Sequence, residues 1–217
     1  MAREPATQQI AVLWLTTLQR ALGRASHDVK DALNGALVNI EVIRGRAGKP
    51  DAPAASIAPF AEAAGQQLDR LTILIDAVLA LGRVEREPAD VVVTLRRVAT
   101  ICGASASFAD AQVTVEVGDL ESAATAVPGD AVRLALAAPL LDLVMGEGRT
   151  ERASPVRCSV RAGDGTTVVT LEAEGRRAAM PVWAEQAVRA AGVRWVMNER
   201  GGEASRMNDL SLEFPRA

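Results

Sequence analysis

A proline-free segment from Thr7 to Arg46 constrains the fold of this chain more than any other feature. Within it, apolar or small side chains recur in alternating steps of three and four residues, with one position missed at Asn39. This heptad spacing predicts a helix that packs lengthwise against other helices. A helix of about 35 residues is about 50 Å long, which is more than one small domain needs. The seam consists of Leu15, Leu18, Leu22, Ala25, Val29, Ala32, Ala36 and Ile43.

A turn and a second helix follow this segment. Residues 45–59 combine glycines with three prolines, which predicts a turn. A helix is expected from about Ala58 to Val84, with a broad apolar face. Two helices cannot enclose such faces alone, whereas two hairpins form a four-helix bundle, so we expect a homodimer. The second apolar stripe consists of Leu68, Leu71, Ile75 and Val78, widened by Leu74 and Leu81.

The pattern changes after residue 87, where short strands begin to alternate with helices. The turn at Gly163-Asp164-Gly165 predicts a β-hairpin. We therefore expect an α+β chain with two domains: residues 1–87 form a helical hairpin and residues 88–217 form a mixed α/β sandwich. Helices are expected at 91–102, 129–145 and 183–191, and strands at 112–117, 156–161, 167–172, 193–198 and 210–214.

The composition argues against several classes of protein. Aromatic residues make up 3% of the chain and the formal net charge is -3, so neither base stacking nor a basic field favours nucleic acid. The first apolar stretch is interrupted at Thr16 and Thr17, too early for a membrane span or a signal peptide, and we expect a cytoplasmic protein. Cys102 and Cys158 lack metal-ligand spacing, so we expect reduced, structural thiols and no metal site.

His27 is the only histidine in the chain, so any reaction that needs an imidazole must use it. The heptad places it at position f, away from the seam and toward water. Asp28 follows directly, and its carboxylate can accept the ring N–H, fix the tautomer and raise the nucleophilicity of the other nitrogen. An exposed histidine beside an aspartate is also an ordinary surface feature, and the pair alone does not separate the two interpretations.

The sequence around this pair resembles the histidine kinase family. The run from His27 to Asn34, His-Asp-Val-Lys-Asp-Ala-Leu-Asn, is similar to the phosphoacceptor box of that family. Residues 68–85, which end in Arg-Val-Glu, are similar to its second dimerisation helix. The resemblance implies a four-helix bundle formed by two protomers, with a response regulator receiver domain docking beside the histidine.

The second domain resembles the ATP-binding domain of the same family in layout, but its functional boxes differ. Gly146 stands in the box 142–147 where the family has a metal-binding Asn, and glycine has no side chain to hold a metal ion. Residues 173–181 keep one glycine of the family's glycine-rich loop. The resemblance therefore implies a degenerate nucleotide domain with no cofactor and no metal. The alternative is that this domain never was a nucleotide fold.

Together these features predict a histidine phosphotransfer protein of a two-component phosphorelay, which passes a phosphoryl group between His27 and receiver aspartates without binding ATP. Asp28 is expected to orient the ring. Lys30 either helps neutralise phosphoryl oxygens or is an ordinary solvated surface lysine, and the second interpretation is the more common one for such a residue. Asp31 stands where related kinases place Thr or Asn residues that orient a hydrolytic water, but a carboxylate at this position would repel the phosphoryl group. Two alternatives are a non-catalytic docking scaffold for response regulators and an active ATP-dependent histidine kinase.

Overall fold

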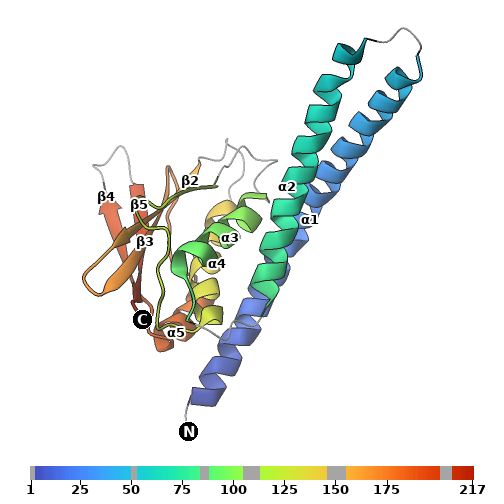
Figure 1. Cartoon of the computed structure of the whole chain (residues 1–217). Coiled ribbons are helices and arrows are strands. Elements are labelled where there is room, and N and C mark those ends of the chain that lie inside the picture. Colours follow the sequence, from blue (N-terminus) through green and yellow to red (C-terminus); the bar gives the residue numbers. More distant parts are fainter. Residues whose placement is uncertain (1–2, 50–52, 84–87, 105–112, 146–154, 201–206) are drawn as a thin grey trace.

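A computed structural model describes residues 3–49, 53–83, 88–104, 113–145, 155–200 and 207–217. The chain begins with a long antiparallel hairpin (Figure 1). Its helices are α1 (Arg3–Ala47) and α2 (Ala58–Gly82), with a 3-10 turn, η1 (Ala54–Ser56), before α2. The Arg46 guanidinium donates to the Ser56 carbonyl at 2.6 Å and lies over the Phe60 ring at 4.5 Å, which ties the two helices together at the turn. Both helices expected from the sequence are confirmed.

The second half of the chain is an α/β sandwich with one mixed sheet. The five strands lie in the order β1-β2-β3-β5-β4, with β1 parallel to β2 and the other pairs antiparallel. The helical hairpin followed by this sandwich confirms the α+β class. The elements are α3 (Val91–Ala104), β1 (Val113–Glu116), α4 (Gly129–Met145), β2 (Val156–Ala162), β3 (Thr166–Ala173), α5 (Val182–Ala190), β4 (Arg194–Arg200) and β5 (Met207–Pro215).

The expected β-hairpin is formed by β2 and β3. Gly165 adopts a left-handed conformation with φ of 64°, and the Gly163 N–H donates to the Thr166 carbonyl at 2.8 Å. Glycine is favoured at this φ because it has no side chain that could clash with the backbone. The turn chemistry of the sequence therefore explains the antiparallel register of the two strands.

Asp90 explains why α3 begins where it does. Its Oδ1 accepts the Val93 N–H at 2.8 Å, and its Oδ2 accepts the Ala123 N–H at 2.9 Å as well as the Ser122 hydroxyl. The pKa of Asp90 lies below its ordinary value: partial burial acts to raise it, but these hydrogen bonds outweigh that effect. One carboxylate therefore caps α3 and anchors the segment before α4.

Helices α3 and α4 form a layer between the sheet and the hairpin (Figure 1). Helix α4 is buried almost along its whole length, which is typical of a helix covered on opposite sides. A single buried cluster joins residues of the hairpin, such as Trp14 and Leu81, to residues of α3, α4 and the sheet. The hairpin and the sandwich thus share one core. Residues 84–87 lie outside the described part, so the domain boundary after residue 87 stays a prediction.

The heptad seam of α1 is only partly the buried face. Leu18, Ala25, Ala32 and Ala36 are buried as expected, whereas Leu15 is 56% exposed. Further buried residues lie beside the seam, at Ile10, Trp14, Thr17, Ala21 and Asp28. The buried face is rotated because α1 packs against α4 as well as against α2. The contact with α4 joins segments far apart in the sequence, so the heptad pattern of the hairpin does not contain it.

The apolar stripe of α2 is rotated in the same way. Leu74, Ala77 and Leu81 form its buried face, while Leu68 and Ile75 are each 45% exposed. The residues expected only to widen the stripe are therefore part of its centre. The reason is that α2 packs between α1 and α3, which leaves Leu68 and Ile75 of the predicted stripe on the exposed side of the helix.

The two cysteines are free and buried in the sandwich, as expected from their spacing. Burial raises the pKa of Cys158 to about 12, and burial, followed by the neighbouring Cys158, raises the pKa of Cys102. Among the described residues, no group of His, Cys, Asp and Glu side chains could hold a metal ion. Within the same part of the chain, no helix has the length and the apolar character needed to cross a membrane.

Candidate functional site

His27 lies on an open face of α1. Its side chain is exposed, as the heptad position predicts, while Ala25 and Asp28 on either side of it are buried. A side-chain carbon added at Gly23, about one turn before His27, would meet no atom within 4 Å. The Ser26 hydroxyl between them bonds back to the Gly23 carbonyl at 2.8 Å instead of projecting outward. The imidazole is therefore accessible to a partner along this face.

Asp28 is held by the opposite helix. Its Oδ2 accepts a hydrogen bond from the Arg70 guanidinium on α2 at 2.9 Å, and the two groups form an ion pair. The Asp28 side chain is 2% exposed and the Arg70 side chain is 47% exposed. The carboxylate next to His27 is thus fixed by a charge-assisted bond across the hairpin.

Lys30 and Asp31 lie one turn beyond His27, and both side chains are exposed. Residues three and four positions apart on a helix are surface neighbours, with about 5–6 Å between their Cβ atoms. The four residues singled out in the sequence therefore fall within one turn of α1, but only three of them face solvent. Asp28 faces α2.

Arg70 was not identified from the sequence as a functional residue. It is the only basic residue of α2, which otherwise carries acidic, polar and apolar side chains. That isolation is a usable signal, because a single cation on a helix facing another helix is available to pair with a carboxylate there. Its partner could not be found from the sequence, since the two residues are 42 positions apart.

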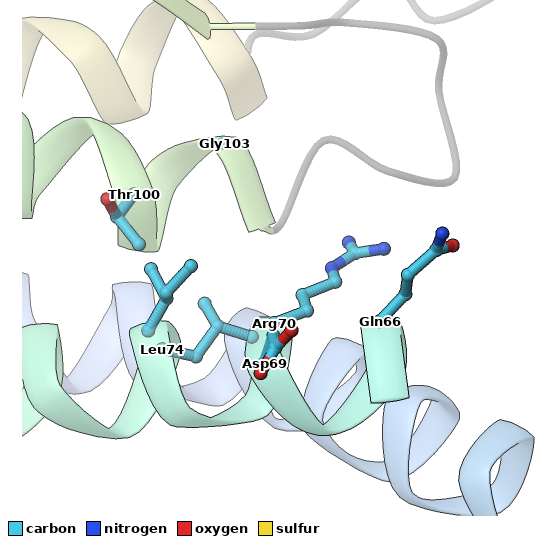
Figure 2. A pocket seen from close by; sticks show the side chains of 7 residues that line it. Gln66, Asp69, Arg70, Leu74, Thr100 and Gly103 are labelled. Carbon is cyan, nitrogen blue, oxygen red and sulfur yellow. The ribbon is translucent and has the colours of Figure 1, made fainter. Parts of the chain in front are cut away.

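A groove of about 450 Å³ lies between α2 and the end of α3, and Arg70 is part of its wall (Figure 2). Gln66 and Asp69 extend the polar part of the wall along α2, while Leu74 and Thr100 lie at the other end. Arg70 therefore stands between two features, the buried Asp28 carboxylate and an open groove.

Among the described residues, the segment where the sequence predicts a glycine-rich nucleotide loop packs against the rest of the chain. Gly175 takes a left-handed conformation with φ of 70°, and the Arg176 guanidinium donates to the Leu143 carbonyl near the end of α4 at 2.5 Å. Ala178 and Met180 are buried in the core. Of the predicted metal box, Asp142 is exposed, whereas Gly146 and Glu147 lie outside the described residues.

Helix α1 covers the other side of α4. Trp14 is 5% exposed, and the buried Arg133 guanidinium of α4 lies 6.0 Å from the centre of its ring. Among the described residues, a cleft between α1, α4 and α5 has a volume of about 100 Å³. Pockets for small molecules and cofactors are commonly about 300–1,000 Å³. The cleft is lined by Thr17, Arg20, Ala138, Leu141, Asp142, Met145, Pro181 and Trp183.

No protein-family model matches this chain, and no curated protein matches its sequence. Solved structures do match. The histidine kinase domain of a blue-light activated histidine kinase from Erythrobacter litoralis is 15% identical, covering 91% of this chain and 94% of that chain, with a TM-score of 0.47. A histidine kinase, ThkA, in complex with the response regulator protein TrrA is 12% identical, covering 94% of this chain and 63% of that chain, with a TM-score of 0.47.

A bacterial phosphotransferase is 16% identical, covering 90% of this chain and 95% of that chain, with a TM-score of 0.41. The solved structures to which this chain is similar thus include histidine kinases and a phosphotransferase. At identities and scores this low, the fold described above rests on the helices and strands of the chain itself.

Proposed function

We propose that this chain belongs to the histidine kinase core family and works as a histidine phosphotransfer protein between receiver domains of response regulators. The observation that carries the proposal is the placement of His27. It is the only imidazole of the chain, it is exposed on a long helix of a hairpin, and it stands in a sequence similar to a phosphoacceptor box.

The transfer step needs little bond-making by the protein itself. A lone pair on one nitrogen of His27 forms the N–P bond, while the bond between phosphorus and the aspartyl oxygen of the receiver breaks. The electron pair of the broken bond leaves on the receiver's carboxylate. Asp28 follows His27 directly in the chain, and we propose that its carboxylate accepts the N–H of the other ring nitrogen, orients the ring and stabilises its positive charge. Lys30 lies on the same exposed face, where it can attract phosphoryl oxygens.

Asp31 is the residue on this face that bears on phosphate removal. It stands where related kinases place a residue that can orient a hydrolytic water, and its exposed carboxylate would repel the phosphoryl group. We therefore propose transfer rather than hydrolysis as the activity of this face.

The functional unit is proposed to be a homodimer. Apolar side chains between 38% and 56% exposed recur on one face of each hairpin helix. Exposed apolar patches of this kind mark interaction sites, and a second hairpin supplies a matching surface. We call these residues the bundle stripe: Leu15, Leu33, Leu37 and Ile40 on α1, and Leu68, Ile75 and Leu79 on α2.

The α/β sandwich is proposed not to bind ATP. Three features support this: the cleft beside α4 is about 100 Å³, Arg176 bonds to the end of α4, and α1 packs across that helix through Trp14. A nucleotide placed against these parts of α4 would have to displace packed side chains. The sandwich would then act as a support for α1 and as a docking body rather than as a source of phosphate.

The test of the proposal is the variant His27→Ala. The protein is mixed with a receiver domain that has been charged with radiolabelled acetyl phosphate, and acid-labile label on this chain is measured. Wild-type protein is expected to take up label and His27→Ala to take up none. Its helix content should stay the same, because the side chain is exposed and alanine is the better helix former. A folded His27→Ala variant that still accepts acid-labile phosphate would contradict the function.

A further inference from the structure

We propose that Arg70 is a positioning residue for His27 and that it acts by holding the Asp28 carboxylate. The effect of Arg70 on phosphoryl transfer rests on the proposed function. Its effect on the tautomer and orientation of the His27 ring does not depend on that function. Arg70 is on α2 and His27 is on α1, so both helices of the hairpin would contribute residues to the phosphoacceptor site.

The Asp28 carboxylate is buried although it carries a charge. A carboxylate that is 2% exposed has lost nearly all of its water, and such a group needs a partner in the protein. Arg70 supplies one at 2.9 Å from α2. Arg70 on α2 therefore contributes to fixing the position of the Asp28 carboxylate.

The position of the Asp28 carboxylate matters for the neighbouring ring of His27. An exposed imidazole on a helix surface has rotational freedom, and a neighbouring carboxylate that accepts its N–H restricts the ring and selects a tautomer. In this proposal Asp28 accepts the ring N–H from the position in which Arg70 holds it. The arrangement has the logic of other activated nucleophiles, in which the group beside the nucleophile is itself oriented by a third group.

Arg70 could position Asp28 or could contact the phosphoryl group directly. The Arg70 side chain is 47% exposed and borders the groove between α2 and α3, so an arginine here could also bind phosphoryl oxygens itself (Figure 2). The two roles differ in one respect. A positioning residue loses its effect when Asp28 is removed, whereas a residue that contacts the phosphoryl group keeps it.

The structural part is tested by the nitrogen chemical shifts of the single imidazole, measured by NMR on the full-length protein. Arg70→Gln and Asp28→Asn are each expected to change the tautomer ratio of His27 by about fivefold in the same direction, the factor that one net hydrogen bond contributes. Arg70→Lys should restore part of the wild-type ratio. The matched control is Asp69→Asn, which removes an adjacent, exposed charge in the same groove and should leave the ratio unchanged.

The double variant Asp28→Asn/Arg70→Gln keeps the test valid if Arg70→Gln alone fails to fold, because it leaves no buried charge without a partner. The double variant is expected to match Asp28→Asn in tautomer ratio within about twofold. A ratio in Arg70→Gln equal to that of the wild type would overturn the proposal. So would a double variant that differs clearly from Asp28→Asn.

The same variants are then compared in the rate of phosphoryl acceptance from a receiver charged with acetyl phosphate. Asp28→Asn and Arg70→Gln are each expected to slow acceptance by about 10-fold or more, and the double variant should be no slower than Asp28→Asn. Effects that multiply would show that Arg70 acts directly and would overturn positioning. If wild-type protein accepts no phosphate while the tautomer ratios couple as expected, the proposed function fails and the positioning of the ring stands.

Discussion

The variant Trp14→Ala tests whether the hairpin and the sandwich unfold as one cooperative unit. The side chain is 5% exposed and lies in the cluster that joins α1 to α4, beside Arg133. Truncating a buried aromatic residue to alanine costs about 3–5 kcal/mol, because contacts are lost and a cavity remains. For a chain of this size each 1 kcal/mol lowers Tm by about 2–4 °C, so Trp14→Ala should lower Tm by about 6–20 °C.

The assay follows unfolding with two probes. Far-UV circular dichroism is dominated by the long helices of the hairpin, and the fluorescence of Trp14→Ala comes from Trp183 and Trp195, both in the sandwich. If the core is shared, both signals should shift together to the same lower temperature.

The matched control is Val12→Ala, on the same helix but 58% exposed, which should change Tm by only a few degrees. A fluorescence transition that stays at its wild-type temperature while the dichroism transition falls would refute the shared core. Two separate transitions in the wild type would do the same.

Two further predictions concern assembly and pH. Leu37→Glu changes a residue of the bundle stripe and should convert the dimer to a monomer, as measured by light scattering. The control Val38→Glu changes the next residue, which is 63% exposed but lies outside the stripe, and should remain dimeric. A wild-type protein that is monomeric at micromolar concentration would contradict the proposed dimer. Burial raises the thiol pKa of Cys158 to about 12 and also raises that of Cys102, whereas an unfolded thiol titrates near 8.5. The thiols therefore contribute stability that is fully present below about pH 8.5 and is lost as pH rises toward 12. Urea unfolding should show a free energy of unfolding that falls by about 1 kcal/mol per thiol for each pH unit above 9, and the fall should be absent in Cys102→Ala/Cys158→Ala; an equal fall in that variant would assign the effect to other groups.

Much of the fold could be predicted from local patterns in the sequence. The proline-free heptad gave the position of α1, and the Gly163–Gly165 turn gave the β2–β3 hairpin, because each depends on residues close in the chain. What could not be predicted is the rotation of the hairpin helices. Leu15 belongs to the seam by spacing and is exposed, while Ile10 and Trp14 are buried, because α4 covers that side of α1.

For the candidate site as well, properties set by one helix could be predicted, whereas properties set by contacts between helices could not. The exposure of His27 follows from its heptad position, which depends only on α1. The burial of Asp28 and its pairing with Arg70 depend on how α2 lies against α1, and no local pattern contains that information. The packing of Trp14 beside Arg133 of α4 likewise joins residues more than 100 positions apart in the chain.

The central claim, that His27 receives phosphate from a receiver domain and not from ATP, is tested most directly by comparing the two donors on the same protein. Wild-type protein and His27→Ala are incubated either with radiolabelled ATP and Mg²⁺ or with a receiver charged with radiolabelled acetyl phosphate. The account predicts acid-labile label on the wild type from the receiver, none from ATP, and none on His27→Ala from either donor. Acid-labile label on wild-type His27 from ATP would contradict it.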